Sequence, residues 1–193
     1  MPVEHLVPVA VRRRLFTADE YQRMGEVGIL SENDRVELIE GEIVTKMTIG
    51  SRHNASVDRA NRAFVTGAGD QAIVRVQGSF RLSGYSEPEP DLVLLRPRAD
   101  FYASRLPGPA DIFLVIEIAD SSIDIDRKVK ARIYAEYGVQ EYWIVDLNQN
   151  ALTRYSEPHG GTYRNVQPYR RGQTLAPALL PGCPIAVDVL LPE

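Results

Sequence analysis

Cysteine and long hydrophobic runs are nearly missing from this 193-residue sequence. The single cysteine, Cys183, excludes an internal disulfide framework and a cysteine-based zinc site. No apolar run reaches the ~18 residues that a membrane span needs, so we expect no membrane partner. The arginines at 12–14 follow a short Val/Ala/Pro stretch, which is the reverse of a secretory signal. These absences predict a cytoplasmic protein.

Several catalytic and ligand-binding motifs are also absent. No glycine-rich loop matches a phosphate-binding or dinucleotide-binding fingerprint, and no GxSxG elbow occurs. The three histidines lie far apart, without the helical spacing of a metal site. The net charge of −4 does not indicate nucleic-acid binding by the chain as a whole.

The residues that are present predict an α/β protein. Hydrophobic residues make up 44% and charged residues 25%, as in ordinary globular proteins, and the length suits a single domain over 1–193 with an extended lead-in at 1–15. The patterns predict helices at about 17–25, 51–65 and 124–137, a hairpin at 36–44 around Glu40–Gly41, strands at about 72–77, 79–82, 91–95, 112–118 and 141–147, and then short strands and loops. This order predicts a mixed central sheet flanked by helices, with strand 112–118 near its middle.

Glu117 is the most informative acidic residue. It lies within FLVIEIADSS (113–122), where apolar residues on both alternating faces predict a strand buried from both sides. A carboxylate is almost never buried without a partner or a metal, because desolvating an isolated charge is strongly unfavourable. Glu117 must therefore face a cleft or a cation.

Asp91 is the second candidate, because it enters an apolar strand directly after Pro90 in SEPEPDLVLL. In the simpler interpretation, Glu87, Glu89 and Asp91 form a solvated turn. Alternatively, two strands of one sheet bring Asp91 and Glu117 together at one edge. Adjacent carboxylates repel unless a hard cation lies between them, and Mg²⁺ or Mn²⁺ is the usual solution.

Lys130 follows in DIDRKVKARIYAEYG, between Asp126 at i−4 and Tyr134 at i+4. A helical lysine is usually solvated, but Lys130 borders the apolar stripe formed by Val129, Ile133 and Tyr137. A helix that packs back on the sheet would aim this ammonium at the carboxylates. Lys128 would point away, because two residues along a helix differ in direction by about 200°.

An aspartate, a glutamate and a lysine in this arrangement suit metal-assisted hydrolysis of a phosphodiester. The cation would polarise the phosphate and activate water, and the ammonium would offset charge in the transition state. For His53 we favour a capping or packing role. The alternative is that His53 lines the cleft and helps to hold a phosphate at the helix N-terminus.

Longer motifs make the sequence resemble a known family. PDLVLL, VIEIADSS and DRKVKARIYAEYGVQEYWIVD resemble the bacterial Uma-two family of restriction-endonuclease-like proteins, within the PD-(D/E)XK nuclease superfamily. RVELIEGEIV followed by His53, and the closing LPGCPIAV, resemble the two ends of that family, so the resemblance covers about residues 15–190. It implies a restriction-endonuclease-like core.

The resemblance also implies roles for individual residues. Asp91 and Glu117 match the two metal ligands, and Glu37 matches an upstream acidic residue that could complete the metal shell. The superfamily pattern places a lysine two residues after the glutamate, where this chain has Ala119. The Uma-two family places its lysine on the following helix, and Lys130 matches that position.

Two functions from different classes remain open. The first is a Mg²⁺- or Mn²⁺-dependent endonuclease that hydrolyses DNA, for which a homodimer would suit cleavage of both strands. The complete acidic-plus-lysine set favours this function. The second is a catalytically inactive nuclease-fold module that binds nucleic acid or a protein partner. The negative net charge and the lack of a separate DNA-reading domain favour the second function.

Overall fold

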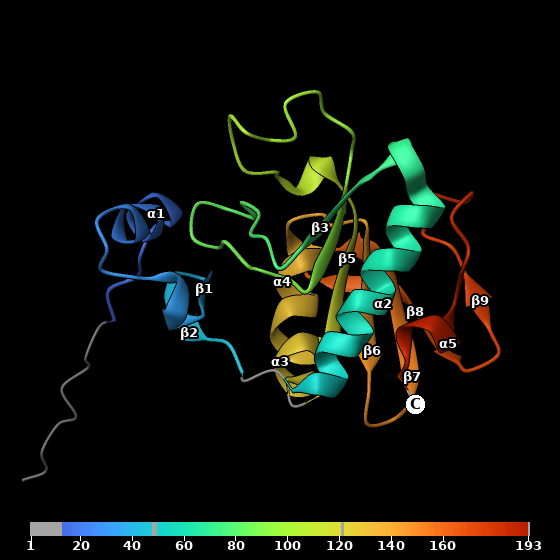
Figure 1. Cartoon of the computed structure of the whole chain (residues 1–193). Helices are drawn as coiled ribbons and strands as arrows, with labels where there is room; N and C mark the ends of the chain where they lie inside the picture. Colours follow the sequence, from blue (N-terminus) through green and yellow to red (C-terminus); the bar gives the residue numbers. More distant parts are fainter. Residues whose placement is uncertain (1–12, 48–49, 121, 193) are drawn as a thin grey trace, which may run out of the picture.

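A six-stranded mixed sheet forms the centre of the protein (Figure 1). The computed structural model describes residues 13–47, 50–120 and 122–192, so most of the lead-in predicted at 1–15 lies outside the described residues. The strand order is β3-β4-β5-β6-β7-β8, in which β5 and β6 are parallel and every other pair is antiparallel. The strands are β3 (Ile73–Val76), β4 (Leu92–Leu95), β5 (Ile112–Ala119), β6 (Glu141–Asp146), β7 (Ala151–His159) and β8 (Thr162–Arg170). The prediction of a mixed sheet with strand 112–118 near its middle is confirmed.

Helices cover both faces of this sheet (Figure 1). Helix α2 (Ser51–Ala68) packs on one face through a cluster that includes Phe64 and Trp143. The connection from β5 to β6 covers the other face. It consists of α3 (Ile123–Ile125), the π-helix η4 (Asp126–Lys130) and α4 (Ala131–Glu136). All eight residues of β5 are buried, because both faces of this strand are covered.

The N-terminal segment folds beside the sheet as a helix and a hairpin (Figure 1). Helix α1 (Ala18–Glu26) begins with the predicted capping box of Thr17 and Glu20. The 3₁₀ turn η1 (Glu32–Asp34) leads into β1 (Val36–Ile39) and β2 (Glu42–Thr45). Glu40 and Gly41 both have positive φ, 49° and 82°, as a tight two-residue hairpin turn requires.

The C-terminal part is more regular than the sequence pattern predicted. β7 and β8 are nine residues each and form a hairpin around Gly160 and Gly161, which have φ of 55° and 76°. The prediction of only short strands and loops there was wrong, as was the strand predicted at 79–82. The remaining short elements are η2 (Gly69–Gln71), η3 (Pro109–Asp111), β9 (Thr174–Leu175), β10 (Ile185–Ala186) and α5 (Val187–Leu190). Within the described residues, no helix has the length and apolar character that crossing a membrane would take.

The packing of α2 on the sheet makes a test of the fold possible. Phe64 is fully buried, and its ring centroid lies 5.9 Å from that of Trp143 on β6. We expect Phe64→Ala to lower the free energy of unfolding by about 3–5 kcal/mol, because it leaves a cavity between helix and sheet. The neighbouring Val65 is 52% exposed, so Val65→Ala should change the free energy of unfolding by less than ~0.5 kcal/mol. Urea denaturation of the two variants measures the difference, and equal losses would contradict this packing.

Candidate functional site

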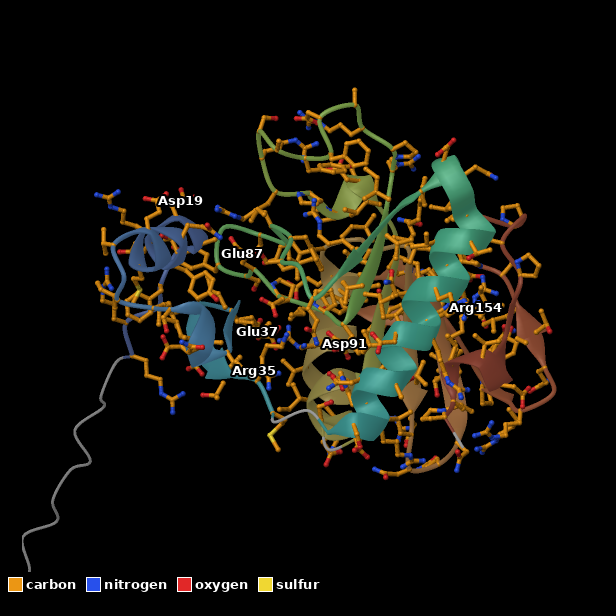
Figure 2. All side chains as sticks on the ribbon, viewed as in Figure 1. Asp19, Arg35, Glu37, Glu87, Asp91 and Arg154 are labelled. Atoms are coloured by element: carbon orange, nitrogen blue, oxygen red, sulfur yellow. The ribbon has the colours of Figure 1, made fainter. Side chains whose placement is uncertain are left out.

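A cleft of about 470 Å³ lies between the β1–β2 hairpin and one edge of the central sheet. The hairpin wall includes Arg35 and Glu37, and the opposite wall includes Asp91, Glu117 and Lys130. In Figure 2, Arg35 and Glu37 are seen on the hairpin side, and Asp91 on the side of the sheet. The cleft therefore brings together the four residues that the sequence analysis assigned to catalysis and metal binding.

The loop before β4 positions Asp91 because the hairpin holds it at several points. The backbone of Leu38 on β1 exchanges hydrogen bonds with that of Glu87, at 3.3 Å and 2.8 Å. The backbone N–H of Glu40 donates to Ser86 Oγ at 2.9 Å. Glu87 is buried beside Arg81, so the solvated-turn interpretation is wrong for it. Asp91, at the end of this loop, is buried as well.

Asp91 is bound directly to β5 and α2. Its Oδ2 accepts a hydrogen bond from the backbone N–H of Ile118 at 2.8 Å and lies 3.0 Å from Nε2 of His53. Its own backbone N–H donates to Glu117 Oε2 at 3.4 Å. Burial opposes ionisation of Asp91, but the hydrogen bond and charge of His53 and the Ile118 N–H outweigh it and lower the pKa. Asp91 and Glu117 therefore lie beside one another, as predicted, and the expectation that their carboxylates share one cation stays a prediction.

Glu117 has a lysine as its charged partner. Its Oε1 accepts a hydrogen bond from Lys130 Nζ at 2.8 Å, and the hydroxyl of Tyr134 lies 3.4 Å from the same oxygen. Burial raises the pKa of Glu117 to about 8; the ammonium of Lys130 opposes this rise, and the neighbouring carboxylates, Asp126 first, add to it. Glu117 therefore lies in a buried group of carboxyl side chains, with the ammonium of Lys130 as its charged partner.

Lys130 reaches the carboxylates from η4. It is buried, and its Nζ lies 2.9 Å from Glu37 Oε1 as well as 2.8 Å from Glu117 Oε1. Burial alone would disfavour the ammonium, but these two carboxylates outweigh that effect and raise the pKa of Lys130 well above its usual value. Ala119 lies on the same strand two residues after Glu117 and is buried, so the ammonium beside Glu117 comes from the helix and not from this strand.

The predicted difference between the two lysines is confirmed. Lys128 is exposed, and its Nζ pairs with Asp124 at 2.9 Å on the outer side of the helix. One detail of the predicted apolar stripe is wrong, because Tyr137 is 42% exposed. Helix α4 ends at Glu136, so the chain turns away before Tyr137 can pack on the sheet.

Glu37 occupies a different place from the one expected of a third metal ligand. Its Oε1 pairs with Lys130, and its Oε2 accepts the backbone N–H of Glu89 at 3.0 Å. Among the described residues, no three histidine, cysteine, aspartate or glutamate side chains are arranged to hold a metal ion. Glu37 as a metal ligand stays a prediction.

Two carboxylates are nevertheless a sufficient protein contribution for Mg²⁺, which usually keeps several waters and binds substrate phosphates. Within the described part of the chain, the side-chain hydrogen bonds to Asp91 go to Oδ2 and not to Oδ1. Glu117 Oε2 has only the 3.4 Å contact from the Asp91 N–H. The oxygen donors of Asp91 and Glu117 therefore fit a hard divalent cation.

His53 lies in the cleft and does not cap its helix. The N-cap of α2 is Gly50, without a side-chain cap. His53 is buried, lines the cleft and contacts Asp91, while its Nδ1 has no protein partner among the described residues. The capping half of the expected role is wrong, whereas the burial of His53 agrees with the packing half. Whether His53 helps to hold a phosphate stays a prediction.

Asp126 is a further residue of the cleft, which was not among the predicted site residues. Asp126 is buried in η4, lines the cleft and accepts a hydrogen bond from Ser122 Oγ at 2.6 Å. Burial raises its pKa to about 6, although Lys130 opposes the shift. The available signal was its spacing of four residues before Lys130, which places both side chains on one helical face.

The raised pKa values predict how stability depends on pH. A carboxyl whose pKa is higher in the folded protein keeps its proton where the unfolded chain has lost it, so its contribution is full at low pH and falls as pH rises. We expect the free energy of unfolding, without metal, to fall from about pH 5 to about pH 8 because of Glu117 and Asp126. Glu117→Gln should flatten the upper half of this decline, and Glu136→Gln, on an exposed site, should leave it unchanged. Urea denaturation across this range tests the assignment, and identical slopes for wild type and Glu117→Gln would refute it.

A cation at Asp91 and Glu117 should stabilise the folded state. We expect Mg²⁺ or Mn²⁺ at ten times its Kd to raise the Tm by about 3–6 °C, because it binds the folded protein alone. Asp91→Asn should remove the shift, and Asp58→Asn, on the exposed side of α2, should keep it. Thermal melts with and without metal measure this, and a shift that survives Asp91→Asn would place the cation elsewhere.

Comparisons with known proteins agree with the fold and with the resemblance described above. A crystal structure of "a putative nuclease belonging to DUF820 from Anabaena variabilis ATCC 29413" is similar to this chain with a TM-score of 0.70 and 15% sequence identity. The similarity covers 91% of this chain and 97% of that one, and at this identity it shows a shared nuclease-like fold. No curated protein matches the chain. The family model Uma2, described as "Putative restriction endonuclease", matches residues 18–188, and the chain therefore belongs to the Uma2 family.

Proposed function

We propose that this protein is a metal-dependent endonuclease that hydrolyses phosphodiester bonds of DNA. The observation that carries the proposal is the meeting of Asp91, Glu117 and Lys130 at one edge of the sheet, inside a cleft. Two carboxylates with free oxygen donors suit a hard cation, and a buried ammonium beside them suits the charge of a phosphoryl transition state. The family match and the nuclease-like fold support the same reaction class.

The charge of the cleft supports a requirement for a cation. Seven acidic side chains line it, against three lysine or arginine side chains. The acidic residues are Glu37, Glu40, Glu42, Asp91, Glu117, Asp120 and Asp126, and the basic residues are Arg35, Lys46 and Lys130. A phosphodiester is itself an anion, so this cleft repels it unless positive charge is added. A divalent cation held by Asp91 and Glu117 supplies that charge.

When bound, such a cation polarises a phosphoryl oxygen and acidifies water. The protein's own residues have separate tasks. Lys130 remains an ammonium because two carboxylates hold it, and it offsets negative charge that develops in the transition state. Asp91 stays ionised beside His53 and is fixed in orientation by the Ile118 N–H. The hydrogen bond from Lys130 orients the carboxylate of Glu117 in turn.

The two lysines provide a matched test. We expect Lys130→Ala to lower the DNA cleavage rate by at least about a hundredfold, since electrostatic groups at a reacting centre commonly contribute that much. Lys128→Ala removes the same charge from the same helix, but from an exposed position, and should change the rate less than about threefold. Initial rates with Mg²⁺ and with Mn²⁺, on single-stranded and double-stranded DNA, measure both effects.

A folding control is needed because Lys130→Ala leaves Glu117 and Glu37 buried without their cation. Such a change destabilises proteins by about 3–5 kcal/mol. The assay therefore includes the double variant Lys130→Gln with Glu37→Gln, which leaves one buried carboxylate without its cation instead of two. Urea denaturation of each protein measures the remaining loss of stability. Cleavage retained in both folded variants would exclude Lys130 from the reaction. An absence of metal-dependent cleavage in the wild type would instead favour a non-catalytic module on this fold.

A further inference from the structure

The cleft that contains the carboxylates also has an apolar part, which the hydrolysis itself does not use. Ile39 and Val44 line it from the hairpin, and Val129 lines it from η4. The alternation of β1 and β2 explains this placement, since Glu37 pairs with Val44 and Ile39 pairs with Glu42 across the hairpin. Carboxylate and aliphatic side chains therefore occupy neighbouring positions on one hairpin face.

Two exposed apolar side chains extend this surface. Ile125 on α3 is 45% exposed and Met47, just after β2, is 51% exposed, and both line the cleft. Ile39 is buried and Val44 and Val129 are partly buried, so these three also hold the hairpin against the helix. Exposed apolar residues are common on protein surfaces. Ile125 and Met47 are informative because they lie in the same cleft as the candidate phosphate site.

A continuous DNA duplex is a poor match for this surface. Its bases are stacked inside, and it presents charged phosphates and polar base edges to a protein. Apolar side chains next to a phosphate displace its hydrating water and do not replace the lost hydrogen bonds. The acidic lining adds no attraction for a long polyanion. Neither half of the cleft favours a duplex backbone lying across it.

An unpaired nucleotide matches both halves. Its phosphate suits a cation held at the Asp91–Glu117–Lys130 end. Once the base leaves the stack, its flat faces can pack between aliphatic side chains while its polar edge stays toward water. The cleft volume of about 470 Å³ falls within the ~300–1,000 Å³ of pockets that take small organic groups. His53 lines the same cleft with a buried Nδ1 that has no protein partner in the described residues.

We propose that the cleft takes one unpaired nucleotide of a DNA strand, with its base against Ile125, Met47 and the aliphatic floor and its phosphate at the carboxylates. This inference rests on the proposed function for the identity of the phosphate end. It goes further by naming single-stranded or locally unpaired DNA as the substrate. The protein would then distinguish unpaired from paired DNA by whether a base can enter the cleft, and no separate DNA-reading domain is required.

The test compares two strands of equal length and charge. One is a short thymidine oligonucleotide, and the other has the same phosphates but abasic sugars. Fluorescence anisotropy in Ca²⁺, a cation with looser oxygen coordination than Mg²⁺, reports the Kd of each. We expect the wild type to bind the thymidine strand about tenfold more tightly, because packing of one base contributes on that scale. The same thymidine strand paired in a duplex should bind more weakly than when free.

Matched variants show which residues cause the tighter binding of the thymidine strand. Ile125→Gln and Met47→Gln replace exposed apolar groups with neutral side chains of similar length, so they add no charge that would repel phosphate. Each should bring the ratio of the two Kd values toward one. Leu179→Gln makes the same kind of change at a residue that is 42% exposed and does not line the cleft, and it should keep the tenfold ratio.

The outcomes separate this inference from the proposed function. Equal Kd values for the two strands, or tighter binding of the duplex, overturn the nucleotide pocket even where Lys130-dependent cleavage is observed. A preference for the thymidine strand that survives Ile125→Gln and Met47→Gln also overturns it, since the base then binds elsewhere. A preference lost in both variants supports the pocket, and this holds even where the cleavage assay fails and the hydrolytic function is rejected.

Discussion

The ammonium group of Lys130, held between the carboxylates of Glu117 and Glu37, is the interaction on which the site depends. It joins three elements that are separate in the sequence, namely the central strand β5, the π-helix η4 and the N-terminal hairpin. All three side chains are buried, so each would be strongly unfavourable without the others. The hairpin, the helix and the side chain of Glu117 therefore hold one another in position. The same hairpin also holds the loop that positions Asp91.

Much of this arrangement could be predicted from the sequence, because a buried charge needs a partner. Glu117 inside an apolar strand indicated a cleft or a cation, and Asp91 at the start of the neighbouring strand was a reasonable second carboxylate. The side of the helix that Lys130 occupies was predicted correctly although its helical segment is a π-helix, a form that occurs frequently at functional sites. Two residues along a helix point to nearly opposite sides in either form, so Lys128 and Lys130 remained distinguishable.

Other features depend on contacts between distant segments, and local patterns do not contain them. Glu87 looked like a turn residue, yet Gln22 and Arg81 surround it because α1 packs on that loop. Pro158 and Pro168 lie within the long strands β7 and β8, and the Gly160–Gly161 pair between these strands was a hairpin signal that could have been used. Asp126 became a site residue only because η4 turns it inward with Lys130. The sequence thus predicted which charged residues come together better than it predicted the packing that holds them in place.

The docking of the hairpin on the second helical layer also affects the order in which the molecule folds. Arg132 on α4 pairs with Glu40 in the hairpin turn across 92 positions of the chain. Loop-closure entropy opposes such a contact until both partners are already structured, so contacts of this kind form slowly. The β5–helix–β6 unit, whose members are close in sequence, can form earlier. The pairing of Glu37 with Lys130 spans a similar distance in the sequence, so the site is complete only when the hairpin has docked on this helical layer.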